Sequence, residues 1–357
     1  MSMETSLSNG LKITKAISSR IDGVDFKNIN FGKIFTDHMF VCHYENGKWQ
    51  QPEITPYGPI QLDPSARVFH YGQAIFEGMK AYRDADGDTF LFRPDENFKR
   101  INKSAERLAM PAFPEEYFKT GLAKLLEIDS EWIKPGMGNS LYIRPFVIAT
   151  EASVMASESN SYTFYIICSP AQSYYGGEVD VLIADFFSRS ASGGIGYAKA
   201  AGNYAAQFYP TNLAIEKGYQ QIIWTDSSSH EYVEEAGTMN VFFRINDTLL
   251  TAPTSERILD GITRKSILDL ARKEGFDVDV RNIKVSEIIE ASENGSLKEV
   301  FGAGTAAVVS VIKGIGYKDK HYNVPVLADG YAQHFKKSLT NIQYNLSEDY
   351  FGWRVKL

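Results

Sequence analysis

One lysine of this chain, Lys199, has surroundings that suit chemistry, because it lies in the segment GGIGYAKAAGNYAAQ. Glycine and alanine on both sides leave room for a planar ligand, and Tyr204 follows five residues later. A lysine removed from water loses its proton readily and becomes a nucleophile. Thirty-six residues after Lys199, Glu235 in EEAGTMN could hold a ring nitrogen protonated. A lysine for a Schiff base and an acid for a pyridinium are what pyridoxal-phosphate enzymes need.

Glu235 has an acidic neighbour, Glu234, so the pattern offers two carboxylates for one position. Neighbouring side chains of a strand point to opposite faces, so one can contact a ligand while the other points away. The alternative interpretation of Lys199 is a solvated surface residue, because most lysines are exposed. The alternative for Tyr204 is a core tyrosine whose hydroxyl has a hydrogen-bond partner.

Two glycine-containing segments could hold a phosphate group. Gly261 precedes the predicted helix TRKSILDLARKEG, whose first N–H groups and dipole would attract an anion. An ordinary helix start is the alternative. The second segment, residues 302–305, offers close backbone approach and the hydroxyl of Thr305. Arg100 lies off the apolar stripe of its predicted helix, so its position alone indicates a solvated arginine.

Six ordered motifs resemble the branched-chain amino acid aminotransferases, which are fold-type IV pyridoxal-phosphate enzymes. The motifs are YGQAIFEGMKAYR, LFRPDENFKRINKSAERLAMP, LYIRPF, GYAKAAGNY, EEAGTMN and FGAGTAA. The resemblance runs from about Phe31 to about Gly316, which is most of the chain. It implies the fold-type IV architecture, with a smaller N-terminal α/β domain and a larger C-terminal pseudo-barrel α/β domain.

The resemblance also implies a cofactor site for pyridoxal 5'-phosphate. Lys199 would form the Schiff base and Tyr204 would contact the phenolic oxygen. Alignment with the family motif E-[AV]-G-T-M-N selects Glu235 for the pyridine nitrogen and leaves Thr238 to meet the substrate carboxylate or the cofactor. Arginine suits a phosphate because its fork matches two oxygens. The implied phosphate ligands are Arg100, Ile262, Thr263 and Thr305.

The substrate pocket implied by the resemblance combines an apolar wall with polar groups. An apolar wall suits leucine-like side chains, whereas tyrosine hydroxyls and an arginine suit the carboxylate of glutamate. Gly78 would leave room for a branched side chain. The implied residues are Phe31, Tyr71, Phe76, Gly78, Tyr142, Arg144, Tyr174, Thr238 and Ala306. Without the resemblance, the aromatic members would be assigned to the hydrophobic core.

Composition narrows the partners and the location. The chain has 357 residues, of which 44% are hydrophobic and 23% charged, with a net charge of −7, as expected for a globular protein that does not bind nucleic acid. No apolar run is long enough to span a membrane, and the N-terminus lacks the apolar stretch of a secretory signal, so we expect a cytoplasmic protein. Six histidines form no H-E-x-x-H and no C-x-x-C occurs, so no metal is expected.

The two cysteines, Cys42 and Cys168, lie in apolar strand-like runs and are predicted to be buried free thiols in a reducing compartment. Some members of the resembled family carry C-x-x-C after the G-T-A of the glycine turn. The matching positions here are Ala307 and Ser310. A thiol switch is therefore not expected at that place.

Hairpins and helices in both halves indicate an α+β protein. Asn46-Gly47 and Asp86-Gly87 predict two hairpin turns. An amphipathic helix is predicted in DENFKRINKSAERLAM, and further helices in TRKSILDLARKEG and ADGYAQHFKKSL. Strands are predicted in SLYIRPFVIAT, YTFYIICSP, VDVLIADFF, QQIIWTD and MNVFFRI. We expect a small N-terminal domain over residues 1–172, a connection over 173–178, and a C-terminal domain over 179–357 that carries Lys199.

The function implied by the resemblance is transfer of the amino group of leucine, isoleucine or valine to 2-oxoglutarate by a ping-pong cycle. A homodimer is expected, with residues of a neighbouring small domain near the pocket. A D-amino-acid aminotransferase and an aminodeoxychorismate lyase share the lysine and the glutamate, but FEGMKAYR and EAGTMN favour the branched-chain group. A catalytically silent cofactor-binding protein is a further alternative, disfavoured because Arg100, Lys199, Tyr204 and Glu235 occur together.

Overall fold

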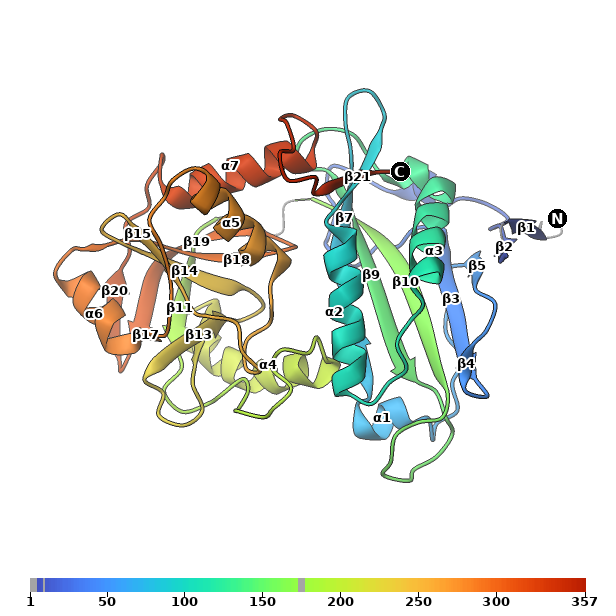
Figure 1. The fold of residues 1–357 in the computed structure, drawn as a ribbon, viewed down its shortest axis with the longest axis horizontal. Helices are drawn as coiled ribbons and strands as arrows, with labels where there is room; N and C mark the ends of the chain where they lie inside the picture. Colours follow the sequence, from blue (N-terminus) through green and yellow to red (C-terminus); the bar gives the residue numbers. More distant parts are fainter. Residues whose placement is uncertain (1–4, 9, 173–176) are drawn as a thin grey trace. The chain divides into compact units, whose positions relative to one another are not determined.

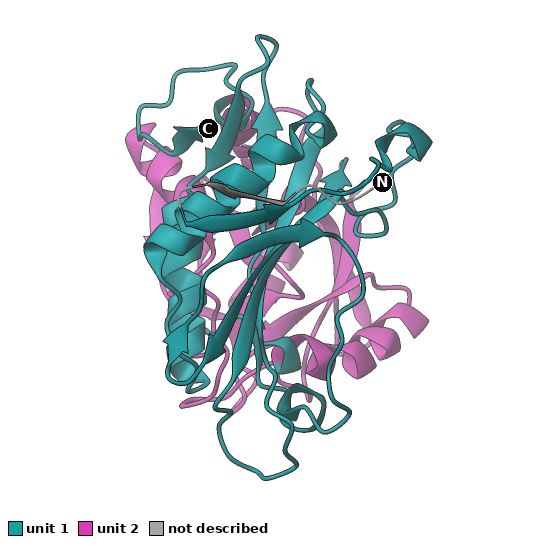
Figure 2. Cartoon of the chain, turned by 90° about the vertical axis from the view of Figure 1, so that its right-hand side faces the viewer, with its two compact units in different colours: residues 1–174, 198–202, 342–357 teal, residues 175–197, 203–341 magenta. Residues whose placement is uncertain are grey.

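The computed structural model describes residues 5–8, 10–172 and 177–357. The chain forms two compact units (Figure 2). Unit 1 comprises Met1–Tyr174, Ala198–Gly202 and Ile342–Leu357, and unit 2 comprises Tyr175–Tyr197 and Asn203–Asn341. Most of the predicted connection at 173–178 lies outside the described residues, so the domain limits stay predictions.

Unit 1 is built on an 11-stranded sheet, with the order β1-β2-β5-β3-β10-β9-β7-β8-β21 and with β4 on β3 and β6 on β9 (Figure 1). The strands are β1 (Thr5–Ser8), β2 (Leu11–Thr14), β3 (His38–Glu45), β4 (Lys48–Trp49), β5 (Glu53–Pro56), β6 (Ala74–Phe76), β7 (Met79–Arg83), β8 (Thr89–Phe92), β9 (Ser140–Ala149), β10 (Tyr162–Ala171) and β21 (Arg354–Lys356). The helices are η1 (Ile21–Gly23), α1 (Arg67–Tyr71), α2 (Pro94–Arg107), α3 (Glu115–Ile128) and η2 (Ser130–Trp132).

Both predicted hairpin turns of unit 1 are confirmed. Asn46 and Gly47 join β3 to β4, and both have positive φ, 52° and 76°. This conformation suits a two-residue hairpin and explains the Asn-Gly pair. Gly87, with φ 90°, lies in the turn between β7 and β8. A side chain at that position would be strained.

The predicted helix over DENFKRINKSAERLAM is α2, which begins at Pro94. Proline suits the first turn of a helix because its missing N–H would have no helical partner there. The carboxylates of Asp95 and Glu96 lie in the first turn, where they interact favourably with the positive end of the helix dipole. Ile101 and Ala105 of α2 are buried in the core that α2 and α3 form with the sheet (Figure 1).

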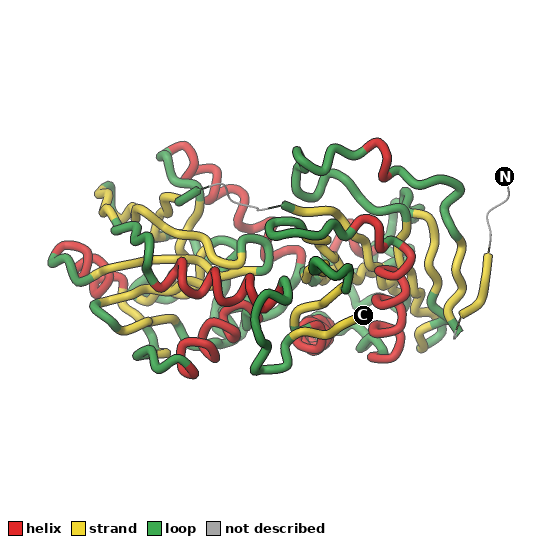
Figure 3. Tube along the Cα trace, turned by 90° about the horizontal axis from the view of Figure 1, so that it is seen from above, coloured by secondary structure: helices red, strands yellow, loops and turns green. Residues whose placement is uncertain are grey.

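Unit 2 contains a 10-stranded mixed sheet, with the order β16-β15-β14-β18-β19-β11-β12-β13-β17 and with β20 on β19. The strands are β11 (Val179–Ile183), β12 (Gln221–Thr225), β13 (Tyr232–Ala236), β14 (Asn240–Ile245), β15 (Thr248–Thr251), β16 (Val278–Val280), β17 (Ile283–Lys284), β18 (Leu297–Gly304), β19 (Val308–Tyr317) and β20 (Lys320–Asn323). The helices, red in Figure 3, include α4 (Ala201–Glu216), α5 (Ile262–Lys273), α6 (Val285–Glu293) and α7 (Tyr331–Gln343).

The sheet of unit 2 curls back on itself at the turn between β13 and β14. Met239 N–H donates to the Ala236 carbonyl and Ala236 N–H donates to the Met239 carbonyl. These two strands are therefore linked directly by the turn, although four strands separate them in the sheet order. The sequence prediction of an α+β protein with two domains is confirmed. No helix within the described ranges is long and apolar enough to cross a membrane.

Candidate active site

The segment that carries Lys199 is attached to unit 1 by its backbone. Phe76 N–H donates to the Lys199 carbonyl at 3.0 Å, and Ile75 forms a β-bridge with Ala200. Lys199 N–H donates to the Ser104 hydroxyl of α2 at 2.9 Å. Residues 198–202 therefore group with the N-terminal sheet, although Lys199 is 123 positions after Phe76, the β6 residue that it contacts.

Several predicted substrate residues gather around the ring of Phe76. Lys199 Nζ lies 4.8 Å from the ring centroid and the Arg144 guanidinium carbon lies 4.5 Å from it. Arg144 Nη2 donates to the Tyr142 hydroxyl at 2.8 Å. The ring of Phe31 meets that of Tyr142 edge-on, with 4.9 Å between centroids. An amine, a guanidinium and an apolar aromatic surface thus occupy one location.

Gly78 belongs to the same cluster for a steric reason. A Cβ atom at this position would lie 2.2 Å from the Tyr142 hydroxyl oxygen, so only glycine fits there. The sequence prediction gave this space to a branched substrate side chain. In the structure, the Tyr142 hydroxyl fills it.

Two predicted substrate residues are not part of this cluster. The Tyr71 side chain is 45% exposed, and its hydroxyl donates to the Val154 carbonyl. Tyr174 lies outside the described residues. The role of Tyr71 in binding substrate therefore stays a prediction.

Arg100 is buried, and the expectation of a solvated arginine from its helix position alone is wrong. Its Nε lies 2.7 Å from Glu77 Oε1 and its Nη2 lies 2.9 Å from Glu77 Oε2. Asn97 donates to the same carboxylate at 2.7 Å. Burial alone would raise the pKa of Glu77, but Arg100, with smaller contributions from Lys199 and Asn97, holds it below its ordinary value. Arg100 is thus fixed in place, and its contact with a phosphate stays a prediction.

In unit 2, the two neighbouring glutamates of β13 have separate arginine partners. Arg189 Nη1 lies 2.8 Å from Glu235 Oε1, and both side chains are buried. Arg257 Nε donates to Glu234 Oε1. Burial raises the pKa of Glu234, and Arg257 opposes that shift. The two glutamates do lie in a strand, and their carboxylates engage different partners.

Glu235 is connected to the start of α5 through Asn240. Asn240 Nδ2 lies 3.4 Å from Glu235 Oε2 and donates to the Leu259 carbonyl at 2.9 Å. Leu259 N–H lies 3.3 Å from Glu235 Oε1. A Cβ atom at Gly261 would lie 1.9 Å from Asn240 Oδ1, so glycine is required where α5 begins.

The N-terminus of α5 suits an anion. In the described structure no side chain caps this helix, which starts at Ile262 after Gly261. Its first N–H groups and its dipole are therefore available for a ligand, and Thr263 in this turn is 8% exposed. These donors suit a phosphate, as the predicted cofactor requires.

The second glycine turn lies beside the turn that holds Thr238. A Cβ atom at Gly304 would lie 3.3 Å from Met239 Cγ and 3.6 Å from the Thr238 carbonyl oxygen. Ala303 is opposite Asn240 in the register of β14 and β18. Thr305 and Ala306 follow directly in the chain. Unit 2 therefore brings the predicted residues of β13, of the 238 turn and of the 305 turn together.

Sequence reasoning missed several buried polar residues of these clusters, among them Glu77, Lys80, Arg189 and Asn240. Glu77 and Lys80 lie within the FEGMK motif, and Asn240 ends EEAGTMN, so motif membership was an available signal. Arg189 lies ten residues before Lys199 in a serine- and glycine-rich segment, where nothing in the pattern distinguishes it.

Among the described residues of unit 1, Lys80 is a buried lysine. It is 7% exposed and lies opposite Tyr142 in the register of β7 and β9, so the two side chains share a face of the sheet. Burial lowers the pKa of Lys80 to about 8. Strand alternation places it on the face of Tyr142 and Arg144, where a second cation would favour an anionic substrate.

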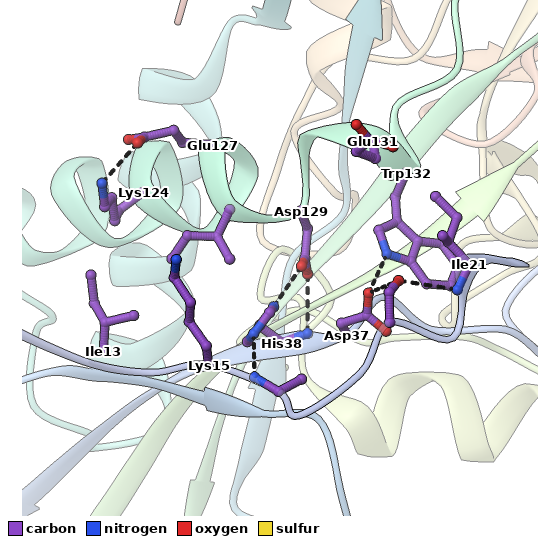
Figure 4. Close-up of a pocket in the computed structure, with 13 residues that line it drawn as sticks. Ile13, Lys15, Ile21, Asp37, His38, Lys124, Glu127, Asp129, Glu131 and Trp132 are labelled. Carbon is purple, nitrogen blue, oxygen red and sulfur yellow. Dashed lines mark hydrogen bonds and ion pairs between the residues drawn. The ribbon is translucent and has the colours of Figure 1, made fainter. Parts of the chain in front are cut away.

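A separate pocket of about 650 Å³ lies in unit 1 and contains none of the predicted site residues (Figure 4). His38 Nδ1 lies 2.6 Å from Asp129 Oδ1, and Ala16 N–H donates to His38 Nε2 at 2.9 Å. Asp37 accepts from Ser19 and from Trp132. These bonds attach the segment after β2 to the end of α3, so the polar groups of this pocket serve the fold.

Comparison with known proteins points to one family. The family model "Amino-transferase class IV" matches residues 74–315. The "Branched-chain-amino-acid transaminase 1" of Bacillus subtilis (strain 168) is 46% identical over 342 residues, covering 93% of this chain and 95% of the relative.

Solved structures show the same fold. The branched-chain aminotransferase of Thermoproteus uzoniensis, in a structure with norvaline, has a TM-score of 0.75 at 21% identity and covers 89% of this chain and 99% of that chain. The branched-chain amino acid aminotransferase of Thermobaculum terrenum, in its PLP-containing holo form, has a TM-score of 0.71 at 19% identity. The match covers 89% of this chain and 97% of that chain. The chain therefore has the fold-type IV architecture.

The lowered pKa of Lys80 predicts an effect of pH on stability. Between about pH 8 and 10.5 the unfolded chain holds this proton and the folded chain does not, so this lysine's contribution to stability rises with pH. Below that window the cost of burying the charge is fully present. We expect Lys80→Met to raise the free energy of unfolding of the cofactor-free protein at pH 7 by roughly 1–3 kcal/mol. The gain should shrink towards pH 10.5, as urea unfolding would show.

Lys80→Arg is the matched control, because arginine keeps its charge throughout this pH range. It should not gain stability between pH 8 and 10.5. A Lys80→Met protein that is less stable than the wild type at pH 7 would mean that the environment compensates the charge.

Both cysteines should be inert in the folded protein. Burial, with a smaller effect of Glu53, raises the pKa of Cys42 to about 12, and burial raises that of Cys168 well above its ordinary value. A thiol with so little thiolate reacts slowly. A chromogenic disulfide reagent should label neither thiol in the native protein and two per chain in denaturant. Fast labelling of the native protein, or a peroxide-induced loss of activity that dithiothreitol reverses, would contradict this assignment.

Proposed function

This chain belongs to the class IV aminotransferase family, and from that membership we propose how its residues transfer the amino group of branched-chain L-amino acids to 2-oxoglutarate. Its branched-chain aminotransferase activity agrees with the motifs of both units. One observation carries the proposal: the amine of Lys199 and the guanidinium of Arg144 lie against the same ring, Phe76. A proton-transfer group is thereby placed beside an apolar surface and a carboxylate-binding cation.

The residues present suit pyridoxal 5'-phosphate. Lys199 would hold it covalently, Glu235 would face its ring nitrogen and Tyr204 its phenolic oxygen. When bound, the ring withdraws electrons from the α carbon of the substrate. The phosphate ligands that we propose are Arg100, Ile262, Thr263 and Thr305. The uncapped start of α5 supports this assignment.

Lys199 is the residue that moves the proton. With the cofactor bound, Lys199 Nζ would accept the proton from the α carbon of the substrate as a general base and return a proton as a general acid. The backbone bonds to Phe76 and Ser104 hold the Lys199 main chain in place during this transfer. The nearby carboxylate of Glu77 is paired with Arg100, so it does not compete for the proton.

One pocket must accept two kinds of side chain in turn, because a ping-pong cycle uses the same site twice. Phe31, Phe76 and the ring of Tyr142 offer an apolar surface to leucine, isoleucine or valine. Arg144 and the Tyr142 hydroxyl offer donors to the distal carboxylate of glutamate or 2-oxoglutarate. Thr238 and Ala306, on the turns of unit 2, would meet the α-carboxylate side of the substrate.

We propose a homodimer, supported by apolar surface that two elements expose. In unit 2, α4 exposes Phe208, Tyr209 and Ile215 at 67%, 65% and 55%, and carries no lysine or arginine. Phe186 is 77% exposed, and the ring of its neighbour Phe187 lies 5.8 Å from that of Tyr209. Exposed apolar patches of this kind mark interfaces.

A second apolar patch surrounds Tyr71 in unit 1. Phe69, Val154 and Met155 are 61%, 65% and 66% exposed. We propose that Tyr71 works near the pocket of the neighbouring subunit, which agrees with its position outside the Phe76 cluster. We further propose that the protein acts in the cytoplasm, because the free thiols of Cys42 and Cys168 suit a reducing compartment.

The function can be tested through Lys199. Wild-type protein should transfer the amino group of L-leucine to 2-oxoglutarate and be inactive with D-alanine. Lys199→Ala should still bind the cofactor through its phosphate but lose almost all turnover, because the proton carrier is gone. Borohydride reduction followed by peptide mapping should label Lys199. A label on another lysine, or turnover of D-alanine but not of L-leucine, would refute the assignment.

The dimer can be tested on α4. Phe208→Glu should shift the mass in sedimentation from twice the 40.0 kDa chain mass towards a single chain, because a buried charge in an apolar interface is costly. Met137→Glu is the matched control, since Met137 is also exposed, at 56%, and lies away from α4 in sequence. A wild-type protein that sediments as a single chain would refute the dimer.

A further inference from the structure

Arg189 makes three contacts through one nitrogen atom, Nη1. Its Nη1 lies 2.8 Å from Glu235 Oε1, 3.0 Å from the Gly196 carbonyl oxygen and 3.1 Å from that of Arg257. The side chains of Arg189 and Glu235 are only 3% and 4% exposed. The arginine therefore joins the carboxylate of β13 to the loop that leads to Lys199.

The contact with Gly196 is a tight one. A Cβ atom at Gly196 would lie 2.3 Å from the Arg257 carbonyl oxygen, so the loop approaches that backbone as closely as glycine permits. Gly196 precedes Lys199 by three residues. A shift of Arg189 would consequently disturb both Glu235 and the loop.

The charge of Arg189 matters because Glu235 would share one proton with a ring nitrogen. In a site removed from water, a neutral carboxylic acid beside a neutral ring is favoured over a carboxylate beside a pyridinium, since separated charges are costly there. A guanidinium at hydrogen-bond distance reverses this preference, because it stabilises the carboxylate. The proton then stays on the ring, where it increases electron withdrawal.

The other groups around Glu235 do less to stabilise its charge. Asn240 and the N–H of Leu259 are neutral donors at 3.4 and 3.3 Å. Arg264 also interacts with the charge of Glu235, but its Nη2 donates to the Ala252 carbonyl at 2.7 Å. Arg189 is thus a cation in direct contact with Glu235 within its own unit.

We propose that Arg189 is a positioning residue that keeps the Glu235 carboxylate ionised, so that the shared proton resides on the ring nitrogen of the cofactor. This inference rests on the proposed function, because it needs pyridoxal phosphate beside Glu235. It assigns Arg189 a role in setting the electronic state of the ring, in addition to its role in holding the loop.

The test is the ¹⁵N chemical shift of the ring nitrogen in holoenzyme loaded with ¹⁵N-labelled pyridoxal phosphate. Wild-type protein should show a protonated nitrogen throughout the neutral pH range. Arg189→Met should move the signal towards that of a neutral nitrogen and lower kcat by roughly tenfold or more, the effect of at least one pKa unit. Arg189→Lys retains the charge, so it should keep most of the protonated signal.

Arg257→Met is the matched control, because Arg257 pairs with the neighbouring Glu234. It should leave the ring signal unchanged. A protonated ring nitrogen in Arg189→Met would overturn the inference. An equal loss of the protonated signal in Arg189→Lys and Arg189→Met would overturn it as well. If Arg189→Met does not fold, a folded Arg189→Lys with a neutral ring nitrogen would overturn it.

A failure of the proposed function can be distinguished from a failure of the role proposed for Arg189. In that case the wild-type protein itself would not bind pyridoxal phosphate, or its absorption spectrum would not respond to L-leucine. A wild type that responds, together with an unchanged ring signal in Arg189→Met, rejects the role of Arg189 alone.

Discussion

The candidate active site depends on one electrostatic constraint: each carboxylate that is removed from water needs a cation in contact with it. Glu77 in unit 1 is fully buried and is held by Arg100 through two hydrogen bonds. Glu235 in unit 2 is almost fully buried and is held by Arg189. An unpaired buried charge would be neutralised by a proton or would destabilise the fold. Within each unit, the ion pair therefore decides which of the candidate groups can carry charge.

The second requirement is that polar side chains approach the backbone closely, and this explains why Gly78 and Gly261 are glycines. Gly78 leaves space that the Tyr142 hydroxyl fills, and Gly261 leaves space for the Asn240 amide. In both cases the missing side chain lets a polar group approach the backbone, which is where a ligand must be oriented. Lys80 has the opposite energetic effect, because its burial costs stability. A costly buried cation beside Tyr142 is expected at a site that must receive an anionic substrate.

Motifs carried most of the information that the sequence held about the site. The order of six motifs led to the fold type and to the activity, and hairpin turns such as Asn46-Gly47 were evident from residue type alone. Arg100 shows where local pattern misleads. Its helix position indicated solvent, whereas the structure buries it against Glu77, which lies on a different element. A helical stripe describes one helix, and it cannot include a carboxylate that the sheet supplies.

The sequence by itself determined the elements and the identity of the chemical groups, because helix periodicity, turn residues and the lysine motif are local. Only the tertiary structure decided which charges meet. Arg189 is 46 residues from Glu235 and Glu77 is 23 residues from Arg100, and no periodicity spans such separations. The structure also pairs the Tyr71 hydroxyl with the Val154 carbonyl, although Tyr71 and Phe76 are only five positions apart in sequence. Pairing of distant charges depends on strand register and on helix packing, which follow from burial of the whole core.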